Sequence, residues 1–107
     1  MGRNRDPGAA SFDAIDRIVH EPARLAIMAH LAVLDEADFV YLMNETGLTR
    51  GNLSSHMSKL EEAGYITVQK TFAGKTPRTL LALTNAGRRA LRGYRRAMAP
   101  LLAGLPE

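Results

Sequence analysis

The chain has 107 residues, 46% of them hydrophobic, and a formal net charge of +3 at pH 7. This length supports one domain with a real core, and the ordinary charged fraction argues against global disorder. The absence of cysteine excludes disulfides, thiolate catalysis and thiolate metal sites, and it fits a reducing cytoplasm. No signal peptide is recognisable, and no stretch approaches the roughly 20 apolar residues of a membrane span.

The charge is unevenly distributed along the chain. Residues 11–48 carry a net charge of −5, whereas residues 49–107 carry +7. A polyanionic partner would therefore contact the second half. Taken alone, the charge is more simply explained by a solvated surface.

The first segments are an arm and a helix. Residues 1–10 contain glycine, proline and charge without apolar periodicity, which predicts a flexible arm. Helical spacing follows in residues 11–19, with Ser11 as N-cap and Pro22 excluding a longer helix. The apolar positions of this helix are Phe12, Ile15, Ile18 and Val19.

A second helix is expected to begin at Pro22, a residue type that suits the first helical turn. Its run ARLAIMAHLAVL is apolar on almost every side. A helix that is hydrophobic all round is buried, so we expect this one at the centre of the domain.

Two further helices are separated by a very short turn. Asp38 is a suitable N-cap for the first, and Gly47 a suitable stop. Thr49 then caps a helix that runs to about Ala63, where Gly64 ends it. In the first of the two helices, the residues expected to face inward are Phe39, Val40, Leu42 and Met43.

The hydrophobic period then changes from helical to alternating. Residues 65–71 and 77–83 predict two strands of a hairpin around a turn at Phe72–Lys75, with Pro77 near the edge. Thr84 caps a last helix, which Pro100 should end or kink. The order α-α-α-α-β-β-α predicts a mostly helical α+β fold, a helix-turn-helix followed by a wing, as a single domain over residues 11–103.

The helix after Thr49 has two contrasting faces. Leu53, Met57 and Leu60 fall on one side and anchor it to a core. The opposite side is small or polar, which suits the depth of a DNA major groove; it consists of Gly51, Asn52, Ser55, Ser58, Lys59 and Glu62. An ordinary amphipathic surface helix would look similar, but the adjacent hairpin with its cations favours DNA binding.

The last helix is divided into an apolar and a basic arc. The apolar arc holds Ala86, Ala90, Leu91, Tyr94, Ala97, Met98 and Leu101. A small domain has little core left to cover so wide a stripe, so an interface is expected. The basic arc, with Arg88, Arg89, Arg92, Arg95 and Arg96, is as consistent with a solubilising face as with DNA contact.

These motifs resemble the short winged-helix regulators of the MarR and ArsR type. The segments that carry the resemblance are His20–Ile27, Gly47–Thr49, Leu53–Ile66, Lys75–Thr79, Leu83–Thr84 and Gly87–Arg88. The run Leu-Ser-x-His-x-x-x-Leu-Glu-x-x-Gly-Tyr-Ile is specific, and the His-x-Pro-x-Arg start is weaker. The resemblance implies a homodimeric DNA-binding regulator in which the flanking helices form the dimer interface.

The site residues follow from the two faces together with the resemblance. Residues expected to contact DNA are Thr49, Arg50, Asn52, Ser54, Ser55, Lys59, Lys70, Lys75 and Arg78. Residues expected at the dimer interface are Ile15, Ile18, Val19, Leu91, Tyr94, Met98 and Leu101.

No pattern indicates catalysis, a metal or a cofactor. His20 and His30 lack a third ligand at useful spacing, and the hydroxyl side chains lack a positioned base. His56 is read as a partly buried structural histidine. The sequence thus predicts a cytoplasmic, sequence-specific duplex DNA-binding repressor that acts as a homodimer; the alternative is a winged-helix protein–protein module without DNA binding.

Overall fold

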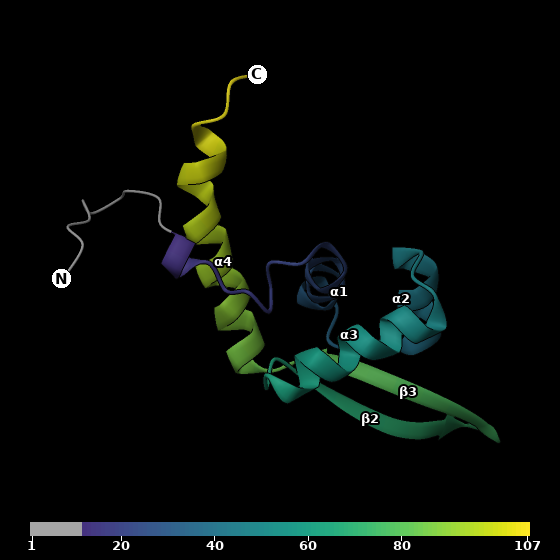
Figure 1. The fold of residues 1–107 in the computed structure, drawn as a ribbon. Helices are drawn as coiled ribbons and strands as arrows, with labels where there is room; N and C mark the ends of the chain where they lie inside the picture. The colour runs from purple at the N-terminus through teal and green to yellow at the C-terminus, as the bar shows by residue number, and fades with distance from the viewer. Residues whose placement is uncertain (1–11) are drawn as a thin grey trace.

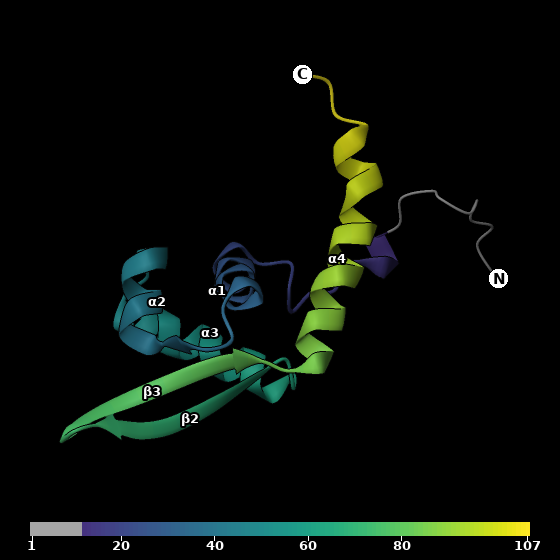
Figure 2. The same ribbon diagram turned by 180° about the vertical axis from the view of Figure 1, so that it is seen from behind.

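The computed structural model describes residues 12–107. It has the predicted α+β winged-helix architecture (Figure 1). The helices are α1 (Pro22–Val33), α2 (Phe39–Thr46), α3 (Arg50–Glu62) and α4 (Asn85–Ala103), and the strands are β1 (Ala37–Asp38), β2 (Ile66–Ala73) and β3 (Thr76–Leu83). The hairpin extends to one side of the helices, and α4 rises away from it (Figures 1 and 2).

The sheet is antiparallel with strand order β1-β3-β2. The hairpin register pairs Ala73 with Thr76, which leaves the two-residue turn Gly74-Lys75. Gly74 has φ 64°, a backbone conformation that glycine adopts without strain. The short strand β1 was not predicted; its two residues pair with β3 opposite Leu80 and Leu81.

The core lies where α1, α2 and α3 meet the sheet. Its fully buried members are Val19, Ile27, Met28, Leu31, Leu42, Leu53, Leu60 and Leu81. The prediction that α1 is buried on every side is wrong, because Val33 is 85% exposed. Val40 was also expected to face inward and is 47% exposed. Both side chains therefore meet solvent.

The predicted helix over residues 11–19 is wrong. The described part of this stretch forms a 3₁₀ turn, Phe12–Ala14, followed by further turns. The Asp16 carboxylate accepts the backbone N–H of Ile18 (2.8 Å) and of Val19 (3.2 Å). A short carboxylate side chain that captures nearby N–H groups competes with helix formation. The predicted arm at residues 1–10 lies outside the described residues.

The helix α4 continues through Pro100 to Ala103, so the proline does not end it. Proline removes one backbone hydrogen bond, and solvent can replace that bond at an exposed position. Among residues 12–107, no helix has both the length and the hydrophobicity that crossing a membrane requires.

Candidate nucleic-acid interface

The helix-turn-helix is built from local capping interactions. The Asp38 carboxylate caps α2 by accepting the N–H of Val40 at 2.7 Å. Gly47 ends α2 at φ 74°, and the Thr49 hydroxyl caps α3 by accepting the N–H of Asn52 at 3.1 Å. The predicted boundaries at Asp38, Gly47 and Thr49 are therefore confirmed.

The helix α3, which is the expected recognition helix, has one face in the core and one in solvent. Leu53 and Leu60 are fully buried, and Met57 is partly buried against the core. The opposite face is exposed as predicted and comprises Gly51, Asn52, Ser55, Ser58, Lys59 and Glu62. Ser54 is only partly exposed, so it lies at the edge of this face. A helix whose exposed side chains are small or polar can enter a major groove without steric hindrance from bulky apolar groups.

The amino end of α3 carries a positive charge in a fixed place. The guanidinium of Arg50 lies over the Phe39 ring at 5.4 Å from its centroid, and Arg50 stays exposed. The first N–H groups of a helix and its dipole also favour an anion at this end. Arg50 and Thr49 are thus placed together at one edge of the exposed face.

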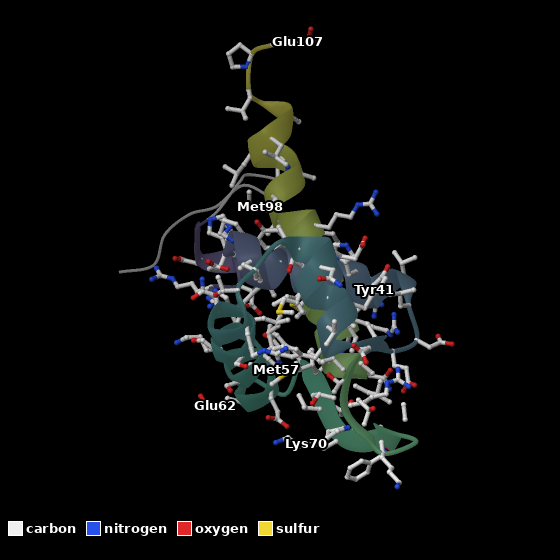
Figure 3. The ribbon with its side chains drawn as sticks, turned by 90° about the vertical axis from the view of Figure 1, so that its right-hand side faces the viewer. Tyr41, Met57, Glu62, Lys70, Met98 and Glu107 are labelled. Atoms are coloured by element: carbon white, nitrogen blue, oxygen red, sulfur yellow. The ribbon has the colours of Figure 1, made fainter. Side chains whose placement is uncertain are left out.

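The wing carries exposed cations beside α3. Lys70 and Lys75 are exposed and have no ion-pair partner within residues 12–107. Figure 3 shows Lys70 on the hairpin, well separated from Met98, which lies higher up on α4.

The structure gives Arg78, one of the expected DNA contacts, a partner within the chain. Its Nε lies 3.0 Å from Oδ2 of Asp38. This hydrogen bond lowers the pKa of Asp38 below its ordinary value. Arg78 on β3 therefore ties the hairpin to the start of α2, whereas Lys70 and Lys75 have no ion-pair partner within residues 12–107.

Sequence reasoning overlooked an exposed aromatic residue on the wing. Phe72 was placed in the turn, yet it lies in β2 and is 68% exposed. It shares a strand face with the core-facing residues Ile66 and Val68. The alternation of these positions could have placed Phe72 in the strand. This face of β2 continues past the end of the core, and Phe72 is therefore exposed to solvent.

The expected dimer residues divide into three sets. Val19 is fully buried within its own chain, so it has no surface for a partner, and that assignment is wrong. Leu91 and Tyr94 pack partly against the core, as does Ile18, and Ile15 is half-buried. Met98 and Leu101 lie farther along α4 and are partly exposed, next to Leu102 (57% exposed) and Leu105 (65% exposed).

Basic side chains cover the other side of α4. Arg89, Arg92, Arg95 and Arg96 are exposed, and no ion pair neutralises them within the described residues. Within residues 12–107, no three histidine, aspartate or glutamate side chains gather as metal ligands would. The exposed charges of the second half of the chain are thus predominantly positive.

Comparisons with known proteins identify the family. Residues 23–102 match the model of the winged helix DNA-binding domain. The uncharacterized protein MJ0432 of Methanocaldococcus jannaschii is 36% identical over 78 residues, which is 73% of this chain and 85% of the relative.

Solved structures show the same architecture. The transcriptional regulator homologue from Pyrococcus horikoshii OT3 superposes with a TM-score of 0.75 at 33% identity, over 86% of this chain and 91% of that one. A MarR-family regulator from Silicibacter pomeroyi shares the fold, with a TM-score of 0.60 at 19% identity over 83% of this chain and 62% of that one. The expected resemblance to MarR and ArsR regulators is confirmed at the level of the fold. The chain therefore belongs to the winged helix DNA-binding family and is a DNA-binding transcriptional regulator.

Proposed function

We propose that this protein binds duplex DNA sequence-specifically as a homodimer and represses transcription at the sites it occupies. The observation that carries the proposal is the exposed polar face of α3, which is flanked by Arg50 at one end and by the lysines of the wing. A winged-helix module that binds only proteins has no need of cations in these places.

The exposed face of α3 is suited to read base edges. Asn52, Ser55 and Lys59 point away from the buried Leu53 and Leu60. An asparagine side chain can make a bidentate contact with adenine and a lysine can donate to guanine, whereas a serine hydroxyl suits either. These three side chains are the proposed source of sequence preference.

Phosphate contacts are assigned to the groups that surround this face. The amino end of α3 with Thr49 and Arg50 lies at one edge, and Lys70 and Lys75 lie on the wing. Such contacts fix the position of the protein on the duplex but carry little sequence information. Arg78 is engaged by Asp38 and is left out of this set.

The far end of α4 is the proposed centre of the dimer. Met98, Leu101, Leu102 and Leu105 are apolar and at least partly exposed there. A two-fold contact between these ends would place two recognition helices in successive major grooves. The expected site is nearly palindromic, with half-sites about 10 bp or 34 Å apart. A dimer seated across a promoter blocks polymerase access, which is the basis for proposing repression.

Selection of bound duplexes from a random pool, followed by titration of two variants, tests this function. Asn52→Ala should weaken the selected site by roughly 1–3 kcal/mol and affect scrambled duplex little, because a base contact is lost. Lys75→Ala should weaken both duplexes alike and reduce the slope of log K against log salt by about 1. A pool that shows no enrichment would favour the protein–protein module instead.

A further inference from the structure

The outer part of the hairpin presents two apolar side chains to solvent, Phe72 and Pro77, which we call the wing pair. Phe72 on β2 lies directly opposite Pro77 on β3, and residues that pair in this way share a face of the sheet. Both are exposed. A lone exposed aromatic residue would be ordinary on a protein surface. Here the ring stands beside a proline, whose fixed φ stiffens the strand, on an arm that projects from the domain (Figures 1 and 2).

The wing pair lies on the same side of the sheet as α3. Successive side chains of a strand point to opposite faces, so Phe72 shares its face with Val68 and Ile66. Ile66 joins Leu53 of α3 in the hydrophobic core, which places α3 over this face. A duplex seated on the exposed side of α3 would therefore meet the face of the wing that carries Phe72.

The surroundings of the wing pair are cationic. Lys70 lies two positions before Phe72 on the same strand face, and Lys75 lies in the turn. Neither lysine is neutralised by a carboxylate of the described residues, and no acidic residue occurs anywhere between Ile66 and Leu83. Exposed cations around an apolar centre suit a partner with phosphates outside and stacked bases inside, which is the arrangement of a DNA groove.

The reach of the arm matches the spacing of neighbouring grooves. Val68 is the last apolar residue of β2 that packs against the core, and four residues at about 3.3 Å each carry Phe72 about 13 Å farther out. One turn of the duplex is about 34 Å long, so a minor groove lies about 17 Å from the major groove that α3 would occupy. The length of the Phe72 side chain covers the remainder.

We propose that the wing pair is a wedge, which enters the minor groove beside the site read by α3 and kinks the duplex there. Phenylalanine and proline both serve as wedges that partly unstack a base step and bend DNA by about 20–90°. The inference rests on the proposed function, because α3 brings the wing to this groove. It adds a second kind of specificity: an easily unstacked step such as TA under the wing should favour binding, although no polar side chain reads its bases.

Energy transfer between dyes at the two ends of the selected duplex tests the kink. The wild type should bend the duplex by at least about 20°, and Phe72→Leu should keep most of this bend, because leucine also acts as a wedge. Phe72→Ala should leave the duplex straight. The matched control is Lys70→Ala, which should keep the bend while the slope of log K against log salt falls by about 1. A straight duplex with the wild type, or an equal bend with Phe72→Ala, overturns the proposal.

A second measurement needs no selected site. The wild type should bind a duplex with one central mismatch about tenfold more tightly than the fully paired duplex, because part of the cost of unstacking is already met. Phe72→Ala should bind both alike. Equal wild-type affinities for the two duplexes overturn the wedge, even where the random pool is enriched and the proposed function stands.

The remaining outcomes separate the wedge from the proposed function. A pool without enrichment contradicts sequence-specific binding, whereas a mismatch preference that Phe72→Ala removes still supports the wedge. Absence of any duplex binding overturns both. Sedimentation of Phe72→Ala tests the other use of an exposed ring, a contact between copies. If this variant weakens the dimer and keeps the wild-type bend, the wedge is overturned.

Discussion

The two halves of α4 carry one continuous apolar stripe but make very different contacts. The first half is fastened to the domain, because the Thr84 hydroxyl accepts the N–H of Gly87 at 3.0 Å and donates to the Gly64 carbonyl at 2.6 Å. In the second half, Met98 and Leu101 are partly exposed, and Leu102 is 57% exposed. The same helical pattern thus serves folding at one end and leaves an apolar surface at the other.

This difference shows what a hydrophobic stripe can and cannot specify. Periodicity indicates which side of a helix is apolar, but not what covers it. Leu91 and Tyr94 are partly covered by their own chain, whereas the carboxyl end of α4 extends past the body of the domain (Figures 1 and 2). The first half should therefore govern stability, and the second half association.

The largest expected effect is at the closest contact of the first half. A Cβ at Gly87 would lie 2.1 Å from the backbone carbonyl oxygen of Tyr65. Because a backbone atom cannot move aside cheaply, Gly87→Ala should lower the free energy of unfolding by about 3 kcal/mol or more. Urea unfolding measures this change.

Gly93 on the same helix is the matched control. A Cβ there meets nothing within 4 Å, and alanine is the better helix former. Gly93→Ala should therefore raise stability by up to about 1 kcal/mol. Equal destabilisation by the two variants would mean that the close contact with Tyr65 does not hold α4.

A smaller effect on folding but a clear one on association is expected in the second half. Met98→Asp places a charge on the exposed apolar surface and should weaken dimerisation by about 1–3 kcal/mol, with little change in the unfolding of the monomer. Sedimentation equilibrium over a range of protein concentrations measures this. If this variant unfolded the domain or left dimerisation unchanged, the second half of α4 would not serve association as proposed.

The smallest effect concerns Tyr65, whose carbonyl faces Gly87. The hydrogen bond to Asp16 raises the pKa of the Tyr65 hydroxyl to about 12. Its contribution to stability is present below the unfolded pKa of about 10 and is lost as the pH rises toward 12. Tyr65→Phe should remove that part of the decrease in unfolding free energy at alkaline pH, on the order of 1 kcal/mol after solvent screening. Identical alkaline unfolding curves for both proteins would show that the hydroxyl does not couple to folding.

The sequence specified the helix-turn-helix well because its signals are local. Asp38, Gly47 and Thr49 each act within four residues of their own position, so caps and stops can be read from short windows. The exposed face of α3 followed from the same periodicity, once Leu53 and Leu60 marked its buried side.

What the sequence did not specify depends on contacts between distant residues. Asp16 is engaged by Tyr65, which is 49 positions away, and this contact accompanies the turn that replaces the expected helix. Arg78 meets Asp38 across 40 positions. No local window contains both members of such a pair. The exposed Val33 was likewise unpredictable, because composition alone does not show that α1 lacks a neighbour on that side.

The mass of the complex with a selected duplex tests the central claim most directly. Light scattering at saturating protein should give two chains on a duplex that holds two half-sites, and Met98→Asp should need a much higher concentration to reach that mass. On dilution, both chains should dissociate from the duplex together, because a single chain on a single half-site binds weakly. One chain per duplex at saturation, with the wild-type affinity kept by Met98→Asp, would contradict the account of a dimeric DNA-binding regulator.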